Sequence, residues 1–110
     1  MASHPVARYD DRMTRGDAIS HLRAHADSVR AMGATSLYLF GSTARNEARP
    51  DSDLDLFIDY DPDSRFNGFD LVGIKLFLED QLGQAIDVTT RDSLHPRLKE
   101  RIEQSAVRVF

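Results

Sequence analysis

Residues 41–59 read GSTARNEARPDSDLDLFID and carry the clearest structural pattern in the chain. The apolar run at 36–40 directly before it predicts a short buried strand. Ten residues (43–52) separate the Gly-Ser pair from an Asp-Leu-Asp segment, where alternation of polar and apolar residues predicts a second strand over 53–59. Its two faces differ in character, one carrying Leu54, Leu56 and Ile58 and the other Asp53, Asp55, Phe57 and Asp59.

The flanking sequence predicts helices and further strands around this core. Helices are expected at 15–32, 70–82 and 96–104, the last with Leu98 and Ile102 facing inward, and strands at 85–89 and 106–110. Thr14 is a candidate N-cap, and Gly33 and Gly83 stand where helices end. Helices that alternate with strands over so short a chain predict an α/β fold with a small mixed β-sheet flanked by helices.

Length and composition limit the class of protein. The chain of 110 residues is long enough for one core, so we expect a flexible leader at 1–13 and a single domain at 14–110. The absence of cysteine excludes disulfides and thiolate chemistry. No apolar run suits a membrane span or a secretory signal, which favours a cytoplasmic protein without a membrane partner.

Charge is concentrated in the middle of the chain. The net charge of -4 argues against direct binding of nucleic acid, which requires clustered Lys and Arg. Six aspartates lie between 51 and 63, and a solvated acidic loop explains those at 59–63. It does not explain Asp53 and Asp55, which share one face of an apolar strand about 7 Å apart. Two like charges so placed favour a bound cation.

The Gly-Ser pair adds a phosphate-binding feature. Gly41 allows a sharp turn and close approach of a phosphate, and Ser42 offers a hydroxyl at the start of a short helix. Carboxylates and phosphate-binding amides at one end of a sheet suit a nucleoside triphosphate with Mg²⁺. Asp87, in the third strand, is the candidate third metal ligand, although a surface acid on an edge strand is an equal alternative when it is considered alone.

Two further features are weaker. Arg45 could contact phosphate or be an exposed structural arginine. His21 and His25 have a zinc-type spacing, but no third ligand is evident, so we interpret them as exposed histidines.

The segment GSTARNEARPDSDLDLFID resembles the signature of the minimal nucleotidyltransferases, small members of the DNA polymerase β-like superfamily. The resemblance extends over about residues 15–110, with an apolar strand around Asp87. Asn46 departs from the pattern because many relatives have glycine there; asparagine tolerates the left-handed backbone, so we expect the turn to be kept.

The resemblance implies a polymerase β-like fold and a Mg²⁺-dependent transfer of AMP from ATP. In such a site Asp53, Asp55 and Asp87 would ligate two Mg²⁺ ions and act as the catalytic residues, with Asp87 also assisting deprotonation of the attacking hydroxyl. Gly41, Ser42 and Arg45 would bind the nucleotide. Solitary proteins of this family are commonly antitoxins that add AMP to a tyrosine of a partner HEPN-type ribonuclease toxin, so a hetero-oligomer is expected.

Three functions stay open at this point. The first is a catalytic AMP transferase acting on a protein. The second is a non-catalytic antitoxin or nucleotide-binding module that neutralises its partner by complex formation. The third is a transferase acting on a small molecule; it is less favoured, because enzymes of that type have a second helical domain for the acceptor.

Overall fold

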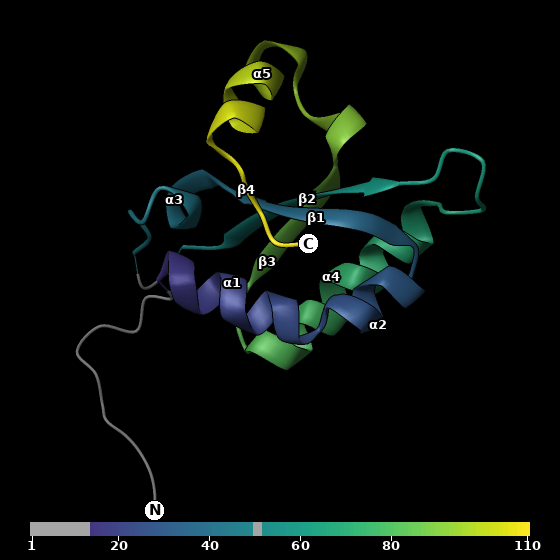
Figure 1. Cartoon of the computed structure of the whole chain (residues 1–110), viewed down its shortest axis with the longest axis horizontal. Helices are drawn as coiled ribbons and strands as arrows, with labels where there is room; N and C mark the ends of the chain where they lie inside the picture. The colour runs from purple at the N-terminus through teal and green to yellow at the C-terminus, as the bar shows by residue number, and fades with distance from the viewer. Residues whose placement is uncertain (1–13, 50–51) are drawn as a thin grey trace, which may run out of the picture.

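A mixed β-sheet of order β3-β2-β1-β4 organises the computed structural model, which describes residues 14–49 and 52–110 (Figure 1). The leader expected at 1–13 lies outside these residues. The strands are β1 (Ala34–Phe40), β2 (Leu54–Tyr60), β3 (Ile86–Thr90) and β4 (Val107–Arg108). The helices are α1 (Arg15–Ala24), α2 (Ala26–Ala31), α3 (Gly41–Ala44), α4 (Gly68–Leu82) and α5 (Pro96–Ser105), with a 3₁₀ turn η1 (Arg91–Ser93). None of the helices in these ranges is both long and apolar enough to cross a bilayer.

The sheet combines both kinds of strand pairing. β1 pairs antiparallel with β2 and with β4, whereas β2 and β3 run parallel. A parallel pair needs a long crossover, which α4 supplies between β2 and β3. The prediction of a small mixed sheet flanked by helices is therefore confirmed.

One face of the sheet forms the apolar core. α1, α2 and α4 lie along this face, and α5 lies on the other side (Figure 1). The alternation predicted for β2 holds, since Leu54, Leu56 and Ile58 are buried in the core. They pack with apolar side chains of the neighbouring strands and helices, among them Leu22, Val29, Leu37, Leu39, Ile74, Leu78, Ile86 and Val88. Removing these side chains from water is the main stabilising contribution to the fold.

The opposite face carries polar and aromatic side chains. Arg91 donates from Nε and Nη2 to the carboxylate of Asp59 (2.7 and 2.9 Å) and from Nη1 to Glu103 of α5 (2.8 Å). Its guanidinium also lies over the rings of Tyr38 and Phe57, 4.8 and 4.9 Å from their centroids. Arg91 thus joins η1 and α5 to the sheet.

The predicted helix over 15–32 is wrong as a single element, because α1 ends at Ala24 and α2 starts at Ala26, with His25 between them. His25 adopts φ -109° and ψ 14°, outside the helical range, and its ring packs edge-on against Phe77 of α4 at 5.6 Å. The break redirects the chain so that Val29 still reaches the core. His21 is exposed, whereas His25 is partly buried, so the interpretation of exposed histidines holds for one of the two.

Leu98 of α5 is a second correction. The helical pattern placed it inward, but 47% of it is exposed, because α5 contacts the sheet through other side chains such as Glu103. The predicted helix ends are confirmed. Thr14 forms a capping box with Asp17, and Gly33 and Gly83 have φ +115° and +66°.

Candidate active site

Two aspartates of the predicted site lie side by side on neighbouring strands. Asp55 of β2 is in register with Asp87 of β3, and both point to the face away from the apolar core. Asp53 precedes β2 by one residue and shares the side of Asp55 by alternation. Asp55 is half-buried, whereas Asp53 and Asp87 are exposed. The parallel register of β2 and β3 therefore brings together the carboxylates that the sequence singled out.

The electrostatics of Asp55 reflect its burial and its charged neighbours. Burial raises the pKa of Asp55 above its ordinary value, and the negative charges of Asp87 and then Asp53 raise it further. The positive charge of Arg45 acts in the opposite direction. A cluster of three carboxylates is unfavourable unless positive charge is supplied nearby.

The Gly-Ser turn lies directly against this cluster. Phe40, the last residue of β1, is in register with Asp55, so the chain passes over the carboxylate as it leaves the strand. Gly41 has φ +79°, and a Cβ built on it would collide with Oδ2 of Asp55 and lie 3.1 Å from its Cγ. Glycine is required here both for its backbone conformation and for the close approach.

Ser42 lies in α3, the short helix expected to start there, and Arg45 is the residue that caps its C-terminal end. The carbonyl of Ser42 accepts a 2.7 Å hydrogen bond from the N–H of Glu47, which closes the turn after the helix. Arg45 is half exposed, and its Nε donates to Oε1 of Glu47 at 3.0 Å. The sequence analysis did not identify Glu47 as the partner of Arg45. The only indication of this pair in the sequence is the opposite charge of residues 45 and 47.

Asn46 connects this turn to α1. Its φ of +59° is left-handed, which confirms that asparagine keeps the turn. Its side-chain oxygen accepts from the N–H of Arg15 (3.3 Å), and Nη1 of Arg15 donates to the carbonyl of Ala44 (3.2 Å). The start of α1 is therefore hydrogen-bonded to the end of α3. The two segments are about thirty residues apart in the sequence, so no local pattern indicates this contact.

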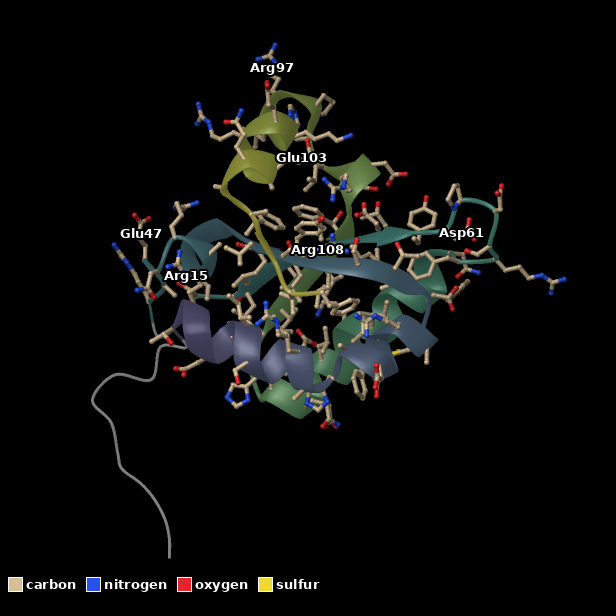
Figure 2. The ribbon with its side chains drawn as sticks, viewed as in Figure 1. Arg15, Glu47, Asp61, Arg97, Glu103 and Arg108 are labelled. Carbon is tan, nitrogen blue, oxygen red and sulfur yellow. The ribbon has the colours of Figure 1, made fainter. Side chains whose placement is uncertain are left out.

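Arg15, Glu47, Asp61 and Arg108 are labelled in Figure 2, with Arg15 and Glu47 at the α3 end of the molecule and Asp61 at the other end.

The cluster suits a hard divalent cation in its chemistry. Carboxylate oxygens are the ligands that Mg²⁺ prefers. Within residues 14–49 and 52–110, however, no three carboxylate or imidazole side chains are gathered tightly enough to hold a metal ion in the present conformation. The donor set and its charge fit the ion, and the side chains would need to turn toward a common point.

Comparison with known proteins agrees with this geometry. Residues 22–109 match the family described as "Nucleotidyltransferase domain". A candidate protein adenylyltransferase of Methanocaldococcus jannaschii is 42% identical over 71% of this chain and 82% of its own length. The protein adenylyltransferase MntA of Thermococcus cleftensis is 29% identical over 88% of this chain and 97% of its own.

Solved structures share the fold. The structure of a candidate minimal nucleotidyltransferase is 36% identical, with a TM-score of 0.65 over 81% of this chain and 93% of that chain. A complex of a tri-AMPylated HEPN toxin with its MNT antitoxin from Shewanella oneidensis is 14% identical, with a TM-score of 0.60 over 84% of this chain and 71% of that chain. The second likeness bears on the fold alone. By its sequence match and its polymerase β-like architecture, this chain belongs to the nucleotidyltransferase domain family.

Proposed function

We propose that the protein transfers AMP from ATP to a tyrosine hydroxyl of a partner HEPN-type toxin and acts as its antitoxin, with Mg²⁺ as cofactor. One observation carries the proposal: Asp55 and Asp87 lie in register beside a Gly-Ser turn that only glycine can form. The names of the relatives, which are protein adenylyltransferases, support AMP as the transferred group. The toxin–antitoxin complex with a similar fold supports the kind of partner.

The residues divide into three roles. Asp53, Asp55 and Asp87 would hold Mg²⁺, which when bound neutralises charge on the triphosphate and on the leaving pyrophosphate. Gly41 and Ser42 would contact the β- and γ-phosphates through backbone N–H groups and the serine hydroxyl. These roles follow from donor chemistry, because phosphate oxygens accept hydrogen bonds and carboxylates do not donate them.

Arg45 supplies positive charge beside the carboxylates. Its charge acts on Asp55, which supports a role in the proposed site, and its bond to Glu47 limits its side-chain freedom. A phosphate entering the site would compete with Glu47 for the guanidinium, which binds phosphate through paired donors.

The transfer itself is a displacement at the α-phosphorus. The tyrosine oxygen forms a bond to the α-phosphorus, the bond from that phosphorus to the bridging oxygen of the β-phosphate breaks, and pyrophosphate leaves. The hydroxyl proton passes to the carboxylate of Asp87, which is exposed and able to face an acceptor. Since ATP is an intracellular substrate, we place the reaction in the cytoplasm.

Mass spectrometry of the intact partner tests the proposal. The chain is purified together with the protein encoded beside it and incubated with ATP and Mg²⁺. The partner should gain mass in whole adenylyl units, and chelation of the metal should prevent the gain. Asp53→Asn should abolish it while the complex and its thermal stability persist, because Asp53 is exposed.

A stable complex whose partner gains no mass would contradict catalysis and favour the non-catalytic antitoxin. Unchanged transfer by Asp53→Asn would contradict the assignment of the site. Mass gained in phosphoryl rather than adenylyl units would contradict the reaction class.

A further inference from the structure

α4 exposes an apolar stripe that the active site does not use. Four large apolar side chains are exposed among the described residues, and three belong to this helix: Phe69 (89%), Val72 (51%) and Leu76 (57%). Their spacing of three and four residues places them on one side of α4, opposite the side that buries Ile74 and Leu78. An exposed phenylalanine within such a stripe indicates a contact surface.

A hollow at the N-terminal end of α4 extends this stripe. It has a volume of about 400 Å³ and is lined by Tyr60, Phe66, Asn67, Gly68, Leu71, Thr90, Asp92 and Ser93. The rings of Tyr60 and Phe66 stack there with centroids 5.0 Å apart. A second hollow, of about 410 Å³, shares Asn67 and Gly68 with the first and is walled by Phe69 and Val72. We call the stripe and the two hollows together the α4 surface.

Acidic side chains border the α4 surface. Asp61 and Asp63 lie on the exposed loop between β2 and α4, and Asp61, the first residue of that loop, is labelled in Figure 2. Asp92 forms part of the wall and accepts a 3.2 Å hydrogen bond from the hydroxyl of Tyr60. The loop also carries the positively charged Arg65, and Lys99 interacts with Asp92. The exposed loop thus carries two acidic residues and one basic residue, and its net charge is negative.

Resting on the function proposed above, we propose that the α4 surface docks an amphipathic helix of the AMP-accepting protein, with apolar side chains facing Phe69 and Leu76 and with Lys or Arg beside them. The stripe covers two helical turns, about 10 Å, which is the length over which the ridges of two helices interlock. The apolar ridge supplies affinity, and the basic side chains meet the acidic loop and accelerate association.

A second copy of this chain fits the α4 surface less well. A two-fold contact places the same surface on both sides, so Asp61 and Asp63 would approach their own equivalents. Like charges placed opposite one another weaken association. A partner of opposite charge avoids this cost.

The α4 surface and the carboxylates are separated along β2. Asp55 is near the start of that strand and Tyr60 at its end, so about 17 Å of extended chain lies between them. A partner held at the α4 surface leaves the Gly-Ser turn open to ATP. Docking and chemistry can therefore be tested with different variants.

The test measures the dissociation constant of the complex between the full chain and the protein encoded beside it, by calorimetry without ATP. The double variant Phe69→Ser/Leu76→Ser should raise the dissociation constant at least about tenfold. Leu98→Ser is the matched control, since Leu98 is the fourth exposed large apolar residue and lies on α5; it should change the constant by no more than about twofold. Asp61→Asn/Asp63→Asn should slow association and reduce its dependence on salt. All variants should unfold near the wild-type temperature, because the substituted side chains are exposed.

Other results would overturn the proposal. Equal dissociation constants for the double variant and wild type would place the partner elsewhere. A wild-type chain that is dimeric in light scattering, and monomeric as Phe69→Ser/Leu76→Ser, would identify a second copy as the occupant. Failure of the wild type to bind would contradict docking by this partner. Both proposals stand if the double variant loses binding and Asp53→Asn loses only transfer. If the double variant loses binding but the wild type transfers no AMP, the docking proposal stands and the proposed function is contradicted.

Discussion

Gly41 determines both the backbone turn after β1 and the position of that turn against Asp55. Its left-handed φ turns the chain out of β1 directly over the carboxylate of Asp55, which leaves no room for a side chain. The turn proposed to bind phosphate and the acids proposed to bind metal are thereby adjacent, although twelve residues separate Ser42 from position 55 in the sequence.

Gly41→Ala should reduce AMP transfer by about a hundredfold, because the added Cβ displaces Asp55 or the turn. The strained backbone should also lower the free energy of unfolding by about 1–3 kcal/mol. Transfer rates and chemical denaturation measure the two effects. Gly16→Ala is the control: Gly16 lies in α1 with open space around it, so the change should leave transfer unaltered. A fully active Gly41→Ala protein would contradict the close packing of turn and carboxylate.

Residue-level chemistry was the most predictable part of the site. The Gly-Ser pair, the acids Asp53 and Asp55 and the left-handed Asn46 follow from conformational and charge preferences that the sequence displays. The bond from Arg15 to Asn46 could not be predicted, since it depends on how α1 packs against α3. Such tertiary contacts have no local signature.

At the scale of elements, the ion-paired Arg91 attaches η1 and α5 to the sheet. Asp59 accepts from Arg91 and from the hydroxyl of Ser36 (2.6 Å). The hydrogen bonds from Arg91 hold the pKa of Asp59 below its ordinary value, in opposition to its partial burial. With the folded pKa lower than the unfolded one, this pair stabilises the fold above about pH 4, and its contribution disappears as the pH falls through the depressed pKa.

Asp59→Asn should therefore be less stable than wild type at pH 7, by about 1 kcal/mol after allowance for the one-third exposure of the carboxylate. The difference should shrink as the pH is lowered below about 4, through the depressed pKa at which wild-type Asp59 becomes protonated. Urea denaturation at several pH values measures it. Asp27→Asn provides a control, because the Asp27–Arg30 pair is exposed and contributes little. A stability difference that stays constant with pH would contradict this role of Asp59.

The elements themselves were predicted to within a few residues, with two informative exceptions. The break between α1 and α2 at His25 involves neither glycine nor proline, and His25 packs there against Phe77 of α4, a tertiary contact that periodicity cannot indicate. Leu98 was placed inward by helical spacing, but α5 is held to the sheet by Arg91 and Glu103. Polar anchoring of this kind lets an apolar residue stay exposed.

At the scale of the whole molecule, the two ends of β2 border two different regions of the surface. One end brings Asp53, Asp55 and Asp87 beside the Gly-Ser turn, and the other borders the α4 surface. The order of the strands was not evident from the sequence, yet it is what sets Asp87 beside Asp55. In the two proposals, this strand keeps the nucleotide and the protein acceptor at separate ends of a chain of 110 residues.

The most direct test of the central claim follows label from ATP to the co-purified partner protein in the presence of Mg²⁺. Parallel reactions with α-labelled and γ-labelled ATP, each with wild type and with Asp55→Asn, separate adenylyl from phosphoryl transfer. Asp55 is half-buried between like charges, and its conversion to the neutral amide should leave the fold intact. We predict label on the partner from α-labelled ATP only, and none with Asp55→Asn. Label from γ-labelled ATP, or undiminished α-label with the variant, would contradict nucleotidyl transfer by this carboxylate cluster.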